Sequence, residues 1–245
     1  MNKRKSRFTV SIHKKYILVA YALVFCVANN AYCNDSMLYI KGGTGLVMPI
    51  GKARIGSGYN LDKKLKSNFQ ASFGLGSTIT DHIRTDIVFS CIGDFSYNSM
   101  FLSSLKGNMI NESQKIKIHT LMLGLYYDFS QSQKISPFIG AGIGVASIRP
   151  NSAMSFSAGS AYKVIKQGES STNLAFGLTA GLSTKINKNI FLESWYQFSY
   201  LGKIKRFRNI NIYKNNSLIS SYILDFSSNY HINAHSINIG IRYML

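Results

Sequence analysis

The 245-residue sequence predicts an all-β chain that forms an eight-stranded antiparallel transmembrane β-barrel, with short periplasmic turns and four long external loops. Three observations predict this fold class. The N-terminus has the layout of an export signal, the rest of the chain contains eight segments of alternating polarity, and the connections between them sort by length. Charged residues make up only 16% of the chain, whereas about 25% is usual in a soluble globular domain.

The first element is a secretory signal peptide. Residues 1–15 hold six Lys or Arg residues and no acid, and residues 16–28 are uncharged and largely apolar. This apolar stretch is too short for a membrane-spanning helix, which needs about 20 residues. Small residues follow at Ala28, Ala31 and Cys33, so cleavage is predicted after Ala31 or after Cys33. We therefore divide the chain into a signal peptide at 1–33 and a barrel at 34–245.

The barrel strands are predicted from alternation of apolar and small or polar residues, which gives a strand one apolar face. In the second strand Phe69, Ala71, Phe73 and Leu75 alternate with polar or glycine positions. The same pattern recurs along the chain, and an even number of strands is typical of bacterial outer-membrane barrels. The eight predicted strands are 37–48, 68–78, 82–96, 116–129, 136–147, 172–185, 189–201 and 232–245.

The lengths of the connections predict which end of the barrel faces outward. The connections after the second, fourth and sixth strands are short, and those after the first, third, fifth and seventh are long. Segregation of short turns from long loops is the arrangement of an outer-membrane barrel, and a soluble sandwich has no reason to show it. We therefore expect a protein of the bacterial outer membrane that is exposed at the cell surface.

The second face of each strand should fill the interior of a barrel this narrow. In the fifth strand Phe138 and Ala146 are predicted to point inward and Ile139 and Ile143 outward. In the third strand the alternation places Ile92 inside and Phe95 outside. Inward aromatic residues, among them Phe138, Phe191, Trp195 and Tyr126, should leave little free bore.

Charged residues on the inner face should pair, because an unpaired ion away from bulk water is costly. Arg84 and Asp86 lie two residues apart on one inner face, and Glu193 and Arg242 are expected near the same rim of adjacent strands. We interpret these four as structural lumen salt bridges and not as catalytic residues. The sequence after residue 33 contains no nucleophile elbow, P-loop, HExxH or dinucleotide fingerprint. We therefore expect no enzymatic activity, no metal site and no cofactor.

Four segments give the chain its resemblance to a known family. They are YIKGGTG at 39–45, SPFIGAGIGVA at 136–146, WYQFSYLGKIK at 195–205 and SINIGIRYML at 236–245. With these the chain resembles the opacity-type small outer-membrane barrels, which include rickettsial-type surface antigens and adhesins. The resemblance implies that the last strand carries the signal read by the barrel assembly machinery. The residues that match this signal are Ile237, Ile239, Ile241, Tyr243 and Leu245, with Leu245 in place of the usual terminal Phe.

The predicted external loops are basic. The loop at 49–67 contains Lys52, Arg54, Lys63 and Lys64, and the loop at 202–231 contains Lys203, Lys205, Arg206, Phe207 and Arg208. A positive rim attracts anionic partners and accelerates encounter in a salt-dependent way. The hypothesis is an adhesin or host-interaction antigen that binds anionic host glycans or host surface or serum proteins through these residues. The alternatives are a structural barrel, whose loop cations contact lipopolysaccharide phosphates, and a small-solute pore; export makes nucleic acid an unlikely partner.

Overall fold

The structure is a computed structural model, and the signal peptide predicted at 1–33 lies outside the residues that it describes. The loop cations Lys52, Arg54, Lys63, Lys64, Lys205, Arg206 and Arg208, with Phe207, also lie outside them. The described residues are 37–50, 66–102, 109–130, 134–151, 153–157, 162–167, 170–204, 209–215, 217–223 and 230–245. Within these ranges no helix is long and apolar enough to cross a membrane.

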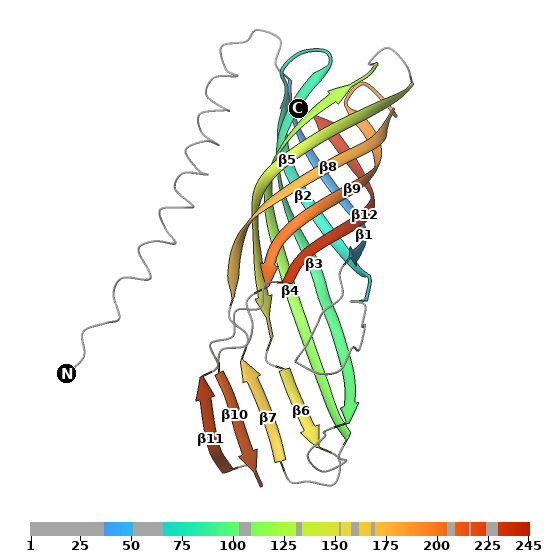
Figure 1. Cartoon of the computed structure of the whole chain (residues 1–245). Coiled ribbons are helices and arrows are strands. Elements are labelled where there is room, and N and C mark those ends of the chain that lie inside the picture. The colour runs from blue at the N-terminus through green and yellow to red at the C-terminus, as the bar shows by residue number, and fades with distance from the viewer. Residues whose placement is uncertain are drawn as a thin grey trace, which may run out of the picture.

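Eight antiparallel strands close into a barrel, as the sequence predicts (Figure 1). Each strand pairs with its neighbour in the order β1, β2, β3, β4, β5, β8, β9, β12, and β12 pairs with β1 to complete the ring. The bounds are β1 Leu38–Ile50, β2 Asn68–Thr78, β3 Ile83–Leu102, β4 Met109–Asp128, β5 Ile135–Pro150, β8 Ser171–Lys185, β9 Ile190–Ile204 and β12 Tyr230–Met244.

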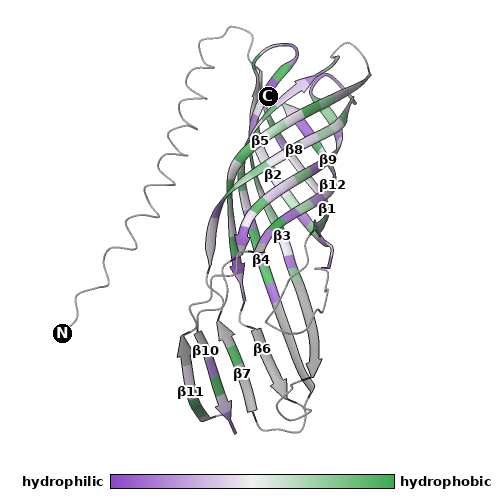
Figure 2. Ribbon diagram, in the orientation of Figure 1, coloured by the Kyte–Doolittle hydropathy of each residue, from purple (hydrophilic) through white to green (hydrophobic). Residues whose placement is uncertain are grey.

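The predicted apolar face forms the outer wall of the barrel (Figure 2). Phe69, Phe73 and Leu75 on β2 are 68%, 57% and 56% exposed, and Ile139 and Ile143 on β5 are each 50% exposed. An apolar wall of this kind is stable against lipid and unstable against water. The inner face is buried, and it includes Phe138 and Ala146 as the alternation predicts.

Tight turns join the strands at the periplasmic end. The amide of Ile79 donates to the carbonyl of Ile83, and the amide of Ile186 donates to the carbonyl of Ile190. In the second turn the side chain of Asn187 accepts hydrogen bonds from the amides of residues 189 and 190. Side-chain acceptors of this kind stabilise a reversal of the chain within a few residues.

Four short strands in the external segments were not predicted from the sequence. They are β6 Ala153–Ser157, β7 Tyr162–Gln167, β10 Asn209–Lys214 and β11 Ser217–Ile223. β3 and β4 also extend beyond their predicted limits, and the outer half of β4 pairs with β6, followed by β7, β10 and β11. Two of the predicted long loops, after the fifth and seventh barrel strands, therefore contain strands of a sheet outside the barrel (Figure 1).

The predicted outward orientation of Phe95 is wrong. Its side chain is 1% exposed and belongs to the buried core, because the pairing of β3 with β4 shifts register between Ile92 and Phe95. A bulge adds one residue to a strand, so all later side chains exchange faces. Simple alternation from Ile83 onward has no means of detecting this shift.

Candidate functional site

The candidate site is the barrel interior together with the external sheet of β6, β7, β10 and β11. At the periplasmic end three cations and three carboxylates form a buried ionic cluster. Arg242 Nε lies 2.9 Å from Glu193 Oε1, and Arg84 Nη1 lies 3.2 Å from the same oxygen. Arg84 Nε lies 3.1 Å from Asp128 Oδ2, and Lys41 forms an ion pair with Asp86. Formal charges within the cluster therefore sum to zero.

This cluster confirms one predicted pair and corrects the other. Glu193 on β9 and Arg242 on β12 meet as expected, since the two strands are neighbours. Arg84 and Asp86 do not pair with each other, because neighbouring inward positions of one strand are about 6.8 Å apart along it. Arg84 instead reaches across the lumen to Glu193, and Asp86 pairs with Lys41 of β1.

Sequence reasoning missed Lys41 and Asp128 as members of the cluster. Both lie at inward positions of predicted strands, so the alternation already indicated that they face the lumen. It did not indicate their partners, because these lie on other strands.

A glycine makes one of these contacts feasible. β2 lies between β1 and β3, and a Cβ at Gly74 would be 3.3 Å from Lys41 Cγ. A larger residue would hinder the reach of Lys41 across β2 to Asp86.

Aromatic rings enclose the guanidinium groups of the cluster. Arg84 Cζ lies 4.7 Å and 4.6 Å from the ring centres of Tyr126 and Phe138, and Arg242 Cζ lies 4.4 Å from that of Phe191. Cation–π contacts are strongest where water is excluded, as it is here. The ions and rings together fill the periplasmic end of the lumen.

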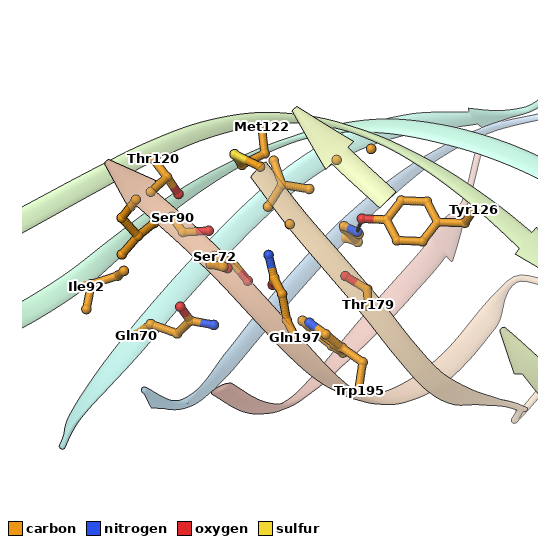
Figure 3. Close-up of a pocket in the computed structure, with 17 residues that line it drawn as sticks. Gln70, Ser72, Ser90, Ile92, Thr120, Met122, Tyr126, Thr179, Trp195 and Gln197 are labelled. Atoms are coloured by element: carbon orange, nitrogen blue, oxygen red, sulfur yellow. Dashed lines mark hydrogen bonds between the residues drawn. The ribbon is translucent and has the colours of Figure 1, made fainter. Parts of the chain in front are cut away.

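A small cavity of about 50 Å³ lies in the middle of the barrel (Figure 3). Its wall combines amide and hydroxyl side chains with glycines, aliphatic side chains and one indole. Gln70 hydrogen-bonds to Asn238, and the Asn238 amide donates to Ser236 Oγ at 3.0 Å. The labelled lining residues are Gln70, Ser72, Ser90, Ile92, Thr120, Met122, Tyr126, Thr179, Trp195 and Gln197. The volume suits a few waters and is too small for an organic ligand.

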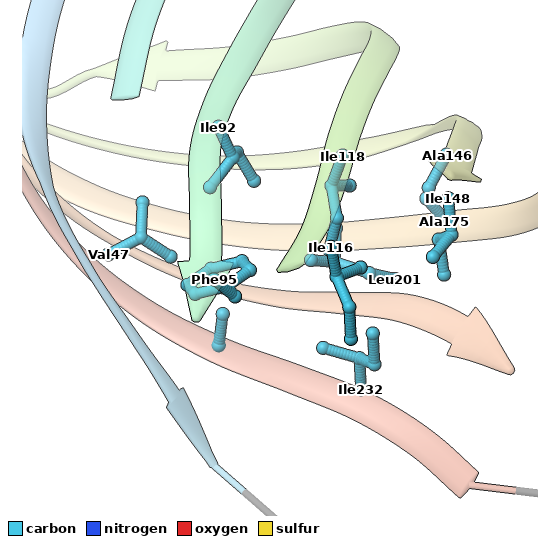
Figure 4. Close-up of a cluster of buried hydrophobic side chains, with 11 residues drawn as sticks. Val47, Ile92, Phe95, Ile116, Ile118, Ala146, Ile148, Ala175, Leu201 and Ile232 are labelled. Carbon is cyan, nitrogen blue, oxygen red and sulfur yellow. The ribbon is translucent and has the colours of Figure 1, made fainter. Parts of the chain in front are cut away.

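An apolar cluster closes the lumen on the external side of this cavity (Figure 4). Phe95, Ile118 and Ile148 are 1%, 0% and 0% exposed, and each comes from a different strand. The remaining members are Val47, Ile92, Ile116, Ala146, Ala175, Leu201, Ile232 and Ala234. The barrel is therefore closed twice, by ions near the periplasm and by hydrocarbon near the cell surface. Alternation places Ile92 and Ala146 of this cluster inside but not Phe95, which the bulge turns toward the lumen.

The predicted binding residues fall mostly beyond the described part of the chain, with one exception. Lys203 was expected in a loop, but β9 continues to Ile204 and places Lys203 in the strand, exposed. Its carbonyl accepts a hydrogen bond from Asn173 Nδ2 at 2.9 Å. The structure therefore ties the start of the basic segment to the barrel wall.

The residues of the predicted assembly signal form one outward row along β12 and the residue that follows it. Ile237, Ile239, Ile241, Tyr243 and Leu245 are each at least 42% exposed. β12 also pairs with β1 to close the ring, and the amide of Leu245 donates to the carbonyl of Leu38 at 2.9 Å. The last strand is thus both the seam of the barrel and part of its lipid-facing surface.

A closed antiparallel barrel with an apolar outer wall, a filled lumen and tight turns at one end defines the class of small outer-membrane barrels. The comparison with known families agrees with this class. The chain belongs to the family described as outer membrane protein beta-barrel domain, whose model matches residues 17–244. The protein is therefore located in the outer membrane and is surrounded by its lipids.

Several known proteins are similar to this chain. A protein of Rickettsia bellii, named as a candidate adhesin, is 28% identical over 213 residues, which cover 82% of this chain and 89% of the relative. The outer membrane protein PagN of Salmonella typhimurium is 28% identical over a segment that covers 41% of each chain. Neisserial surface protein A has a similar solved structure, with a TM-score of 0.52, 14% identity and coverage of 85% of this chain and 97% of that chain.

Proposed function

We propose that this outer-membrane barrel is an adhesin that acts by binding, without catalysis, and that its external sheet and basic external segments form the binding surface. The observation that carries the proposal is the sheet itself. Eight strands already close the barrel, yet β6, β7, β10 and β11 extend the pairing of β4 outside it. Such an extension adds nothing to closure of the barrel, and it presents a structured surface to the outside.

The external sheet has features of a binding surface. β11 is its last described strand and exposes Leu218 and Ile219, which are 56% and 54% exposed. Exposed apolar side chains next to an open strand edge are typical of surfaces that bind other proteins. The rickettsial relatives named as candidate adhesins support the same role.

Positive charge adds a second source of attraction. Lys52, Arg54, Lys63 and Lys64 follow β1. Lys203 lies near the end of β9, and Lys205, Arg206 and Arg208, with Phe207 among them, lie between β9 and β10. Their charge favours acidic host proteins and sulfated host glycans as partners. Because exposed charges are screened within about 8 Å at physiological ionic strength, binding should weaken as salt is added.

The pore alternative is disfavoured by the two closures of the lumen. Ion passage would require separation of the buried ion pairs near the periplasm and wetting of the apolar cluster near the surface. Planar-bilayer recordings of the refolded protein should therefore show no unitary openings. Reproducible openings would support the pore and contradict the closed lumen.

Adhesion is tested by expressing the chain on a non-adherent bacterium and counting cells bound to host monolayers across a salt series. The test variant is Lys205→Gln/Arg206→Gln/Arg208→Gln. The matched control, Lys134→Gln/Lys185→Gln/Lys188→Gln, removes the same charge at the periplasmic end. Binding by the parent and control, with a loss of about tenfold or more in the test variant, is the expected result. Equal adherence of both variants would reject the basic segment as the binding surface, and absence of adherence with verified surface exposure would reject the adhesin.

A further inference from the structure

A basic patch lies on the outer wall of the barrel where β4 and β5 leave the membrane. Lys115, Lys117 and Arg149 are all exposed. Their immediate neighbours Ile116, Ile118 and Ile148 are buried in the lumen. Because side chains alternate between the two faces of a strand, the three cations point away from the lumen. They belong to the barrel wall and not to the external loops.

Strand register brings these cations together. Lys117 pairs directly with Arg149 across β4 and β5, and Lys115 is the next outward residue of β4. Side chains in directly paired positions have Cβ atoms about 5 Å apart, and like charges there repel. Among the described side chains only Asp94 offers a carboxylate, 3.9 Å from Lys117 Nζ, and this pair is partly exposed to solvent. Three cations and one carboxylate leave the patch positive.

The height of the patch matches the phosphate region of the outer leaflet. Lys117 lies ten residues along β4 from Tyr127, an outward aromatic residue at the periplasmic end. With a rise of 3.4 Å per residue and a tilt near 40°, this corresponds to about 26 Å along the membrane normal. The apolar band of such barrels is about 25 Å tall, so the cations lie just above it.

The next outward pair on the periplasmic side of the patch is His119 and Ser147, and apolar side chains follow on the same wall. Leu123 is 37% exposed, Ile143 is 50% exposed and the two are paired in register. Leu174 on the neighbouring strand β8 is 54% exposed. An amphiphile with an anionic head and acyl chains is complementary to cations above and hydrocarbon below, whereas a soluble anion uses only the upper half.

We propose that Lys115, Lys117 and Arg149 form a site for the phosphate group of an outer-leaflet glycolipid whose acyl chains lie against the wall below. The phosphate relieves the repulsion between Lys117 and Arg149, and the Arg149 guanidinium can donate two parallel hydrogen bonds to it. The site lies on the barrel wall, so it does not require the adhesin function. A phosphate bound there fixes the depth and rotation of the barrel relative to the outer leaflet, beyond which the external sheet extends.

Native mass spectrometry of the refolded protein, released from neutral detergent micelles, tests the site with lipid A as the probe. The test variant is Lys115→Gln/Lys117→Gln/Arg149→Gln, and Lys134→Gln/Lys185→Gln/Lys188→Gln is the control with equal loss of charge. Folding of each variant is verified by the difference in gel migration before and after boiling. The second probe is lipid A from which the phosphates have been removed, and the third is inorganic phosphate as a competitor.

The expected result is retention of bisphosphorylated lipid A by the parent and control, with at least about tenfold weaker retention by the test variant. The parent should retain dephosphorylated lipid A only weakly, to the same extent as the test variant retains bisphosphorylated lipid A. Equal retention of lipid A by the folded test variant would overturn the site. Equal retention of the dephosphorylated probe would overturn the phosphate contact, and competition by millimolar inorganic phosphate would show that a free anion, and not a lipid, is the ligand.

Discussion

Glu193→Gln should strongly destabilise the barrel, because Glu193 connects the two buried arginines of the ionic cluster. Its Oε1 lies 2.9 Å from Arg242 Nε and 3.2 Å from Arg84 Nη1, and the residue is 3% exposed. Glutamine keeps the shape and a hydrogen-bond acceptor but removes the charge. The cluster then holds three cations against two carboxylates, out of reach of bulk water.

The size of the effect follows from the geometry. At an effective dielectric constant near 20, two unit charges 3.2 Å apart interact by about 5 kcal/mol. Part of this attraction only offsets the cost of removing the charges from water, a cost that the arginines still carry in the variant. Loss of one partner of a buried pair typically lowers stability by about 3–5 kcal/mol. We expect Glu193→Gln to reduce the free energy of unfolding by an amount in that range.

Urea unfolding in lipid vesicles measures this change. Trp195, the only tryptophan of the chain, lines the lumen cavity, so its fluorescence reports the loss of the folded interior. The matched control is Asp81→Asn, in an exposed periplasmic turn, which should change stability by less than about 0.5 kcal/mol. A Glu193→Gln barrel within about 1 kcal/mol of the parent would refute the view that this carboxylate balances two buried cations.

Three further substitutions, the first paired with a control on the lipid-facing wall, test the packing and the seam of the barrel. Phe95→Ala should cost about 3–5 kcal/mol in the same urea assay because Phe95 is buried in the apolar closure. Phe89→Ala, on the lipid-facing wall, should cost less, and equal losses would contradict the register shift. Gly43→Val should cost about 1–3 kcal/mol and shift the emission of Trp195, since a Cβ at Gly43 would lie 2.6 Å from Trp195 Cη2. Leu245→Phe should raise the fraction of heat-modifiable, assembled barrel in cells, and an unchanged or lower fraction would count against Leu245 as a weakened assembly signal.

Individual residues show where sequence reasoning succeeded and where it failed. Ile139 and Phe138 were assigned to opposite faces correctly, because the two-residue period of a strand is a local property. Phe95 was assigned wrongly, because a bulge depends on how β3 pairs with β4. Glu193 and Arg242 were paired correctly from their positions near a shared rim, whereas the contact of Arg84 with Glu193 crosses the lumen between strands that are not neighbours.

The external segments show the same division. Their charge could be read from the sequence, but β6, β7, β10 and β11 are each at most seven residues long, so each offers only a brief stretch of alternation. Their strand structure comes from pairing with β4 and with one another. The patch of Lys115, Lys117 and Arg149 is similar, since residues 117 and 149 become neighbours only through the register of β4 with β5.

The sequence alone determined the number of barrel strands, the lipid-facing side of most of them and the end that carries the turns, because each follows from local periodicity and connection length. Only the tertiary structure decided which charges pair across the lumen, how the lumen is closed at both ends, and where cations from different strands meet on the wall. These features depend on register and on distances across the barrel, and many sequences with the same local pattern would differ in both.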